Sequence, residues 1–241
     1  MPSFESIRAQ VEQAVPGALR VYRRTSVEVV PTGMPELDSA IGGIPKAALT
    51  QLCAPAWSSS GRTSLLHSLL ARATAEKQYC ALVDAADSFD CNSAAAKGVL
   101  LSRVFWIRGS EQRQSARLEQ GFRSADIVLQ NGGFSIVILD LGSIDDVYIR
   151  KVPLTTWFRF SRVVEKSRTA LICLVSSPVA HSCAALTLQF RNAKIISTGA
   201  TSPSHAGLVE GLDADIEVLR SHLKKPVQSA HPNLIVRVSG Q

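Results

Sequence analysis

Charged residues, aromatic residues and long apolar runs are all in short supply in this sequence. Charged residues make up 19% of the 241 positions and aromatic residues 6%. No apolar stretch approaches the ~18 residues that a membrane-spanning helix needs. Because 46% of the residues are hydrophobic, the chain can bury a full core and is neither disordered nor fibrous. The sequence therefore predicts a globular protein without a membrane partner.

Cysteine is scarce and scattered. None of the five cysteines stands in a Cys-x-x-Cys pair, so the sequence shows neither a disulfide framework nor a zinc site, and we expect no metal ligands. The first residues lack a basic stretch followed by an apolar one, as a secretory signal would have. These absences favour a reduced, cytoplasmic protein, with Cys53, Cys80 and Cys173 in the core.

From residue 47 onward, short apolar runs alternate with helical patterns. This alternation is typical of an α/β fold, in which helices cover a largely parallel sheet. Three further strand-like runs then follow without helices between them, which predicts an antiparallel C-terminal extension at one sheet edge. The predicted strands are 48–53, 79–83, 104–107, 135–139, 170–175, 186–196, 215–222 and 234–238, and the predicted helices are 63–75, 94–98, 118–129 and 157–164.

The first 24 residues form a separate segment in this interpretation. Phe4, Ile7 and Val11 recur at helical spacing and predict a short helix. A basic linker, with arginines at 20, 23 and 24, separates this helix from the rest. We therefore divide the chain into residues 1–24, which offer a docking surface for a second copy or another protein, and a core domain at 25–241. The alternative is that the helix folds back on its own core.

The segment between the strand 48–53 and the helix 63–75 stands where nucleoside triphosphatases carry a phosphate-binding loop. That loop has the pattern Gly-x-x-x-x-Gly-Lys-Ser/Thr, in which backbone N–H groups and the lysine hold phosphates. Here Ala56 replaces the first glycine and Arg62 replaces the lysine, so the motif (Walker A) is degenerate. The alternative is a polar turn in which Thr63 and Ser64 cap the helix. The candidate nucleotide contacts in this loop are Ala56, Ser60, Gly61, Arg62, Thr63 and Ser64.

An acidic residue follows the apolar strand 135–139. Asp140 stands where a nucleoside triphosphatase places the carboxylate that orients magnesium. The alternative is an ordinary turn aspartate at a strand end. Together, the loop and Asp140 predict a vestigial site that binds ATP and magnesium weakly or not at all.

Several segments resemble the RecA-type ATPases in the same order along the chain. They are residues 31–45, the phosphate loop, residues 82–90 and the strand that ends at Asp140. This resemblance implies a RecA-like core, and it implies a RecA subunit as the other protein on which residues 1–24 would dock. Where RecA carries the glutamate that activates the attacking water, this chain has Ala86, which can neither accept a proton nor orient water. We therefore assign no catalytic residue. The alternative is an active DNA-dependent ATPase in which Arg62 and Thr63 hold phosphates and Asp87 is a displaced base.

A second resemblance is to a smaller RecA-like family. Residues 103–108, 129–134 and 152–160 are similar to ImuA, a family of bacterial mutagenesis cassettes that is sometimes grouped with SulA. The resemblance implies an accessory role in translesion DNA synthesis under the SOS response. It implies an ImuB-like protein and a DnaE-type polymerase as partners, with RecA, DNA or a second copy as further contacts. A SulA-like inhibitor of cell division stays open as another alternative.

Basic and aromatic residues are interleaved between positions 150 and 168. The chain carries a net charge of +6, and cations with aromatic rings are suited to phosphates and bases. An alternative is that Trp157, Phe160 and Val164 lie on one helical stripe and pack in the core. The candidate DNA or partner contacts here are Arg150, Lys151, Arg159 and Arg162.

Overall fold

The computed structural model describes residues 3–14, 27–55, 60–197, 209–222 and 233–239. The helices of the described residues are α1 (Phe4–Ala14), α2 (Pro35–Ile41), α3 (Arg62–Ala75), α4 (Cys91–Ala96), α5 (Gln114–Asn131), α6 (Asp146–Ile149) and α7 (Leu154–Glu165), with short 3₁₀ turns at Leu101–Arg103 and His181–Cys183. The strands are β1 (Val29–Val30), β2 (Ile44–Pro45), β3 (Ala48–Cys53), β4 (Cys80–Asp84), β5 (Val104–Arg108), β6 (Ile136–Asp140), β7 (Ala170–Val175), β8 (Ala184–Ser197), β9 (Val209–Ser221) and β10 (Asn233–Ser239).

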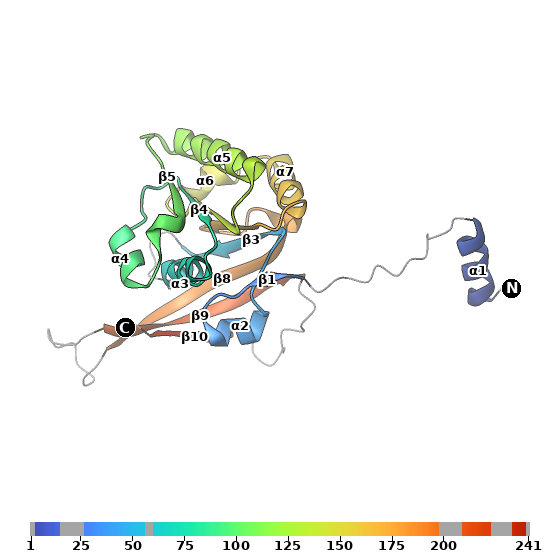
Figure 1. Ribbon diagram of the computed structural model, residues 1–241, viewed down its shortest axis with the longest axis horizontal. Helices are drawn as coiled ribbons and strands as arrows, with labels where there is room; N and C mark the ends of the chain where they lie inside the picture. The colour runs from blue at the N-terminus through green and yellow to red at the C-terminus, as the bar shows by residue number, and fades with distance from the viewer. Residues whose placement is uncertain (1–2, 15–26, 56–59, 198–208, 223–232, 240–241) are drawn as a thin grey trace.

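An eight-stranded sheet organises the protein. Its strand order is β10-β9-β8-β3-β7-β6-β4-β5, and a separate antiparallel pair joins β1 to β2. The strands from β8 to β5 run parallel, whereas β9 pairs antiparallel with β8 and β10 pairs antiparallel with β9. Figure 1 shows α5, α6 and α7 on one face of this sheet and α3 on the other. The predicted α/β class and antiparallel C-terminal extension are confirmed.

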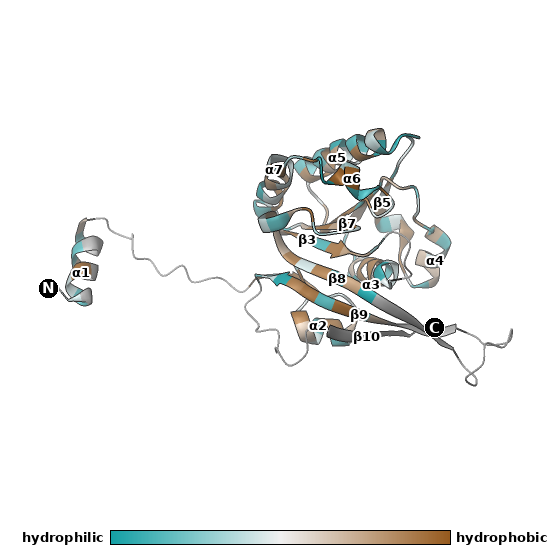
Figure 2. Cartoon of the chain, turned by 180° about the vertical axis from the view of Figure 1, so that it is seen from behind, coloured by the Kyte–Doolittle hydropathy of each residue, from teal (hydrophilic) through white to brown (hydrophobic). Residues whose placement is uncertain are grey.

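The central strands are apolar on both faces because helices cover both. Every residue of β4, β6 and β7 is buried, as expected of parallel strands in a covered sheet. One apolar layer joins the sheet to α2, α3 and α4, and the other joins it to α5, α6 and α7. Figure 2 shows apolar colour along the strands and polar colour on the outer surfaces of α5 and α7.

The element boundaries follow local chemistry. The strands predicted at 48–53 and 170–175 match β3 and β7, and α3 begins one residue before its predicted start. Helix α4, which was predicted at 94–98, begins earlier, at Cys91. It does so because Asp90 caps the helix by accepting a hydrogen bond from the N–H of Asn92. The stripe of Trp157, Phe160 and Val164 is buried along α7, which confirms the core interpretation of these three residues.

The predicted N-terminal helix is present as α1. Figure 1 draws it apart from the sheet and the other helices, and the side chain of Ile7 is exposed. The side chains of Phe4 and Val11 and the whole basic linker at 15–26 lie outside the described residues, so the docking role of this segment stays a prediction. Among the described helices, none is both long and apolar enough to cross a lipid bilayer.

Candidate functional site at the carboxyl ends of the central strands

Four parallel strands end at the same edge of the sheet and bring the predicted loop and strand residues together. β3 ends at Cys53, β4 at Asp84, β6 at Asp140 and β7 at Val175, while α3 begins at Arg62 above them. In open α/β sheets ligands bind at this edge, outside the carboxyl ends of the strands. The sequence placed Arg62 and Asp140 in one site, and in the structure both side chains lie beside Gly142, where each shifts the pKa of the other.

Arg62 turns inward, toward the sheet. Its Nη1 donates a hydrogen bond of 2.9 Å to the carbonyl oxygen of Val175 and a longer one of 3.4 Å to that of Ala54. Burial lowers the pKa of the Arg62 guanidinium, whereas the negative charge of Asp140 raises it. An arginine stays protonated in proteins, so this partly buried cation is held by two backbone carbonyls, with the charge of Asp140 nearby.

Asp140 is nearly buried beneath Arg62. Its Oδ1 accepts a hydrogen bond of 2.8 Å from the N–H of Gly142. Burial raises the pKa of the Asp140 carboxyl, although the Gly142 N–H and the Arg62 charge favour its ionised form. A Cβ at position 142 would collide with the Arg62 guanidinium, so the inward conformation of Arg62 requires glycine there.

The start of α3 has no side-chain cap. Gly61 is the N-cap in a left-handed conformation, with φ of 80°, and neither Thr63 nor Ser64 bonds to the first N–H groups. The interpretation of Thr63 and Ser64 as capping residues is therefore wrong. Ser60 is buried, and its Oγ accepts a 3.4 Å hydrogen bond from the N–H of Arg62. Ala56 lies outside the described residues.

The turn after β4 holds the residue that would have to replace the missing glutamate. Ala86 is followed by Asp87, whose carboxylate forms two hydrogen bonds, of 2.7 and 3.0 Å, with the guanidinium of Arg108 in β5. These bonds lower the pKa of Asp87, which makes the carboxylate a weaker base than an ordinary aspartate. The structure thus ties Asp87 to the neighbouring strand and gives no support to its role as a displaced base.

Asp84 was not singled out from the sequence, yet its carboxylate organises the same turn. It is fully buried and accepts hydrogen bonds from the N–H groups of Ser88 and Phe89 and from the indole of Trp106. An aspartate at the end of an apolar strand was the available signal. With three donors already bound to it, Asp84 acts as a brace for the turn.

Comparison with known proteins defines the family. A family model described as the RecA N-terminal domain matches residues 9–147, which is more than half of the chain. The chain belongs to this family. It is similar to Protein RecA of Rickettsia massiliae (strain Mtu5), 34% identical over 116 residues that cover 47% of this chain and 32% of the relative. It is also similar to the mitochondrial DNA repair protein recA homolog of Dictyostelium discoideum, 32% identical over 121 residues, or 49% of this chain and 25% of the relative.

Protein RecA of Desulfotalea psychrophila (strain LSv54 / DSM 12343) is 27% identical over a longer stretch of 163 residues, which is 61% of this chain and 44% of that protein. The chain thus spans between a quarter and less than half of the length of these RecA relatives. The family match ends at residue 147, within α6, so α7 and the last four strands lie beyond it.

The residues present do not fit the magnesium nucleotide that the RecA resemblance implies. The Arg62 guanidinium donates a hydrogen bond to the carbonyl of Val175. Asp140 accepts a hydrogen bond from the Gly142 N–H and lies near the Arg62 charge. A phosphate would need the Arg62 charge and magnesium would need the Asp140 carboxylate, whereas Arg62 donates to a backbone carbonyl and one Asp140 oxygen already accepts from the Gly142 N–H. In the part of the chain that the structure describes, no three His, Cys, Asp or Glu side chains group as metal ligands. We derive no catalytic step through a nucleotide.

The structure separates the members of the predicted basic and aromatic surface on α7. Trp157 and Phe160 are buried and cannot stack on bases, as the core interpretation predicted, whereas Phe158 is 47% exposed. Arg150 bonds to Asp146 and to Ser177. The three other cations lie beside two hollows in the surface, Lys151 at one, Arg162 at the second and Arg159 at both.

Proposed function

We propose that this chain is a RecA-family accessory protein of DNA-damage-induced translesion synthesis, which acts by contact with other proteins and does not hydrolyse a nucleoside triphosphate. The observation that carries the proposal is the hydrogen bond from Arg62 to the carbonyl of Val175. This bond holds the Arg62 guanidinium against the end of β7. The RecA scaffold is thus kept, while the charge that would bind phosphate stabilises the fold. An accessory role needs surfaces and not a free catalytic centre.

The proposed partners are an ImuB-like protein and a DnaE-type polymerase, with RecA, DNA or a second copy of the chain as further contacts. Membership of the RecA family supports a role in the DNA-damage response, and the name of the Dictyostelium relative includes DNA repair. The more specific role rests on the resemblance to ImuA of residues 103–108, 129–134 and 152–160.

An exposed aromatic surface links two of these three segments. Phe105 in the edge strand β5 is 55% exposed and stacks on Phe134, with ring centres 6.0 Å apart. Nearby, the guanidinium of Arg103 lies 5.2 Å from the ring centre of Tyr79, which is itself exposed. Exposed aromatic side chains beside a cation are frequent anchors in protein interfaces, which supports a contact role for this sheet edge.

A nucleotide titration tests the part of the proposal that concerns hydrolysis. The purified chain is titrated with a fluorescent ATP analogue with and without magnesium, and phosphate release is followed with single-stranded DNA present. We expect weak or undetectable binding and no steady phosphate release. Tight magnesium-dependent binding, with DNA-stimulated release that Asp140→Ala abolishes, would establish the alternative DNA-dependent ATPase.

A side-by-side binding assay tests the accessory role. The immobilised chain is exposed in turn to an ImuB-like protein, a DnaE-type polymerase, RecA and a cell-division GTPase. We expect the ImuB-like protein to bind and Phe105→Ala to weaken its binding. An exposed side chain on helix α3 supplies the control, Arg72→Ala, which should leave binding unchanged. Binding of the GTPase alone would replace the proposal with the SulA-like function.

A further inference from the structure

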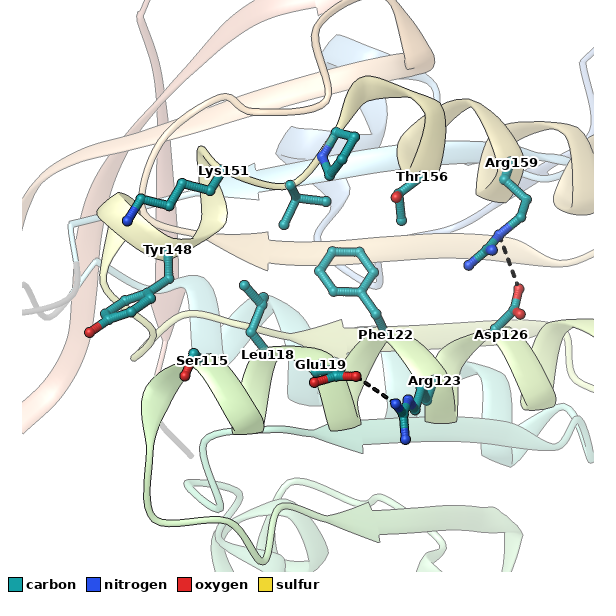
Figure 3. A pocket seen from close by; sticks show the side chains of 12 residues that line it. Ser115, Leu118, Glu119, Phe122, Arg123, Asp126, Tyr148, Lys151, Thr156 and Arg159 are labelled. Carbon is teal, nitrogen blue, oxygen red and sulfur yellow. Dashed lines mark hydrogen bonds and ion pairs between the residues drawn. The ribbon is translucent and has the colours of Figure 1, made fainter.

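A groove lies between α5 and the α6–α7 segment, on the sheet face away from the predicted phosphate loop. It has a volume of about 540 Å³, a size typical of pockets that enclose ligand groups or several side chains. Leu118 and Phe122 of α5 line it together with Val152 and Pro153, and Figure 3 shows the two α5 side chains pointing into the groove. The floor of the groove is therefore apolar. Its more polar lining residues are Ser115, Glu119, Arg123, Asp126, Tyr148, Lys151, Thr156 and Arg159.

A second hollow adjoins the first across α7. It has a volume of about 380 Å³ and is lined by Thr155, Phe158, Arg159, Arg162, Val163 and Lys166. Arg159 borders both hollows, so the two form one surface that runs over α7. We call these two hollows together the α7 groove.

Unpaired cations dominate the rim of the α7 groove. Its two carboxylates are already paired, Glu119 with Arg123 and Asp126 with Arg159. Among the described residues, no carboxylate lies within ion-pairing distance of Lys151, Arg162 or Lys166. Lys151 instead lies 5.8 Å from the ring centre of Tyr148. The rim thus presents three uncompensated positive charges to an incoming molecule.

Exposed apolar side chains accompany these cations. Leu154 and Phe158 stand one helical turn apart on α7 and are 46% and 47% exposed. Residues four apart lie on the same side of a helix, so the two form an apolar stripe. Leu154 lies at the start of α7, and Phe158 lines the second hollow beside Arg162. An apolar stripe flanked by cations is complementary to a segment with apolar side chains on one face and carboxylates beside them.

We infer that the α7 groove binds an acidic amphipathic segment of a partner protein, whose apolar side chains enter the groove and whose carboxylates face Lys151, Arg162 and Lys166. Nucleic acid fits this surface less well. It would satisfy the cations, but on α7 its bases would find only Phe158 exposed for stacking, because Trp157 and Phe160 are buried, and the ring of Tyr148 on α6 is already in contact with Lys151. Nucleic acid also has no aliphatic side chains for the apolar floor. The inference extends the proposed accessory role, and its test uses no translesion protein, so either can fail without the other.

The test selects ligands for the intact chain from a display library of random 16-residue peptides. The selected peptides are synthesised with a fluorescent label and their affinities are measured by anisotropy. We expect sequences rich in Asp and Glu, with Leu, Phe or Trp at helical spacing. Their affinity should fall more than about tenfold with Arg162→Glu/Lys166→Glu, because the introduced glutamates would repel the carboxylates of the peptide. Leu154→Ser/Phe158→Ser should weaken binding as well. This loss of affinity should depend less on salt concentration than the loss caused by the charge reversals.

The matched control reverses two exposed cations on the opposite sheet face, Arg72→Glu/Lys97→Glu, and should leave affinity unchanged. All variants are first checked for an unchanged unfolding midpoint, because their altered side chains are exposed. Selected peptides without acidic residues, or equal binding by the groove and control variants, would overturn the inference.

Competition is measured with a 20-nucleotide DNA strand and with a peptide of residues 1–14. Binding of the DNA in place of any peptide would assign the groove to nucleic acid, and binding of the 1–14 peptide as tightly as the selected ones would assign it to a second copy.

Discussion

The guanidinium of Arg62 and the carbonyl oxygen of Val175 are joined by a 2.9 Å hydrogen bond, although the two residues are 113 positions apart in the sequence. The same oxygen accepts a second hydrogen bond of 3.0 Å from the N–H of Ala54. The start of α3 is thereby fastened to the end of β7, beside Asp140. A residue in the lysine position of a phosphate loop is thus partly buried and bound to the backbone of the sheet.

The first prediction concerns the coupling of Arg62 to Asp140. Arg62→Met removes the hydrogen bonds to the carbonyls of Val175 and Ala54 and the positive charge near Asp140, and we expect the free energy of unfolding to fall by about 1–3 kcal/mol. Asp140→Asn should also destabilise. The double variant should lose less than the two single losses combined. Urea unfolding of the four proteins measures this coupling, and additive losses would show that the two side chains act independently.

The second prediction uses the close contact at Gly142. Gly142→Ala places a methyl group against the Arg62 guanidinium, and we expect a loss of about 1–3 kcal/mol from overpacking. In an Arg62→Ala background the same substitution should cost much less, because the obstructing side chain is gone. Thermal unfolding of the single and double variants distinguishes this steric effect. An equal cost in both backgrounds would place the strain elsewhere.

The third prediction is a pH dependence of stability that arises from His67. This side chain is buried in α3, its Nε2 has no hydrogen-bond partner among the described residues, and its ring contacts that of Phe89. Burial lowers the pKa of His67 below 6.5, and Lys97 adds to this effect while Asp90 opposes it. As pH falls below 6.5, the unfolded chain therefore takes up a proton before the folded protein does, and stability declines until the folded pKa is reached.

Urea unfolding at pH 7.5 and 5.5 measures this effect. We expect the wild type to lose more stability on acidification than His67→Leu, by up to about 1.4 kcal/mol over this range, because pH 5.5 lies about one unit below the pKa of the unfolded histidine. Since other groups also titrate in this range, the comparison between the two proteins is the measurement. An identical loss in both would remove His67 as the cause.

The fourth prediction separates two neighbouring aromatic positions on α7. Phe160 is fully buried and stacks on Phe122, with ring centres 5.5 Å apart, whereas Phe158 faces solvent. Phe160→Ala should lower the free energy of unfolding by about 3–5 kcal/mol. Phe158→Ala should change it by less than about 0.5 kcal/mol. Chemical denaturation of both variants checks the contrast, and a large loss from Phe158→Ala would contradict the exposed placement that the α7 groove requires.

The alternation of apolar and helical segments was sufficient to predict the parallel sheet, because strands covered on both faces, such as β6 and β7, are apolar throughout. The C-terminal strands were also predicted, since no helical pattern interrupts them. The start of α4 was missed because it depends on a single capping contact at Asp90, which periodicity does not reveal.

The site was predictable in position and not in conformation. Sequence placed Arg62 and Asp140 at one edge of the sheet, but spacing cannot tell whether an arginine points to solvent or to a backbone carbonyl. Gln51 shows the same limit. Its side chain accepts hydrogen bonds from the N–H groups of Val179 and Ala180 and donates one to Thr187, a network that only the folded strand order brings together. A glutamine within an apolar strand was its one signal.

The position of β3 has a consequence for the synthesis of the chain. This strand lies between β7 and β8, and its residue Gln51 bonds to Thr187, 136 positions later. A nascent chain that has not yet reached residue 170 therefore carries an apolar strand with both edges open, which is the kind of segment that associates with other chains during slow folding. Cellular yield will accordingly depend on how well chaperones shield residues 48–53 until the ribosome has delivered both neighbours.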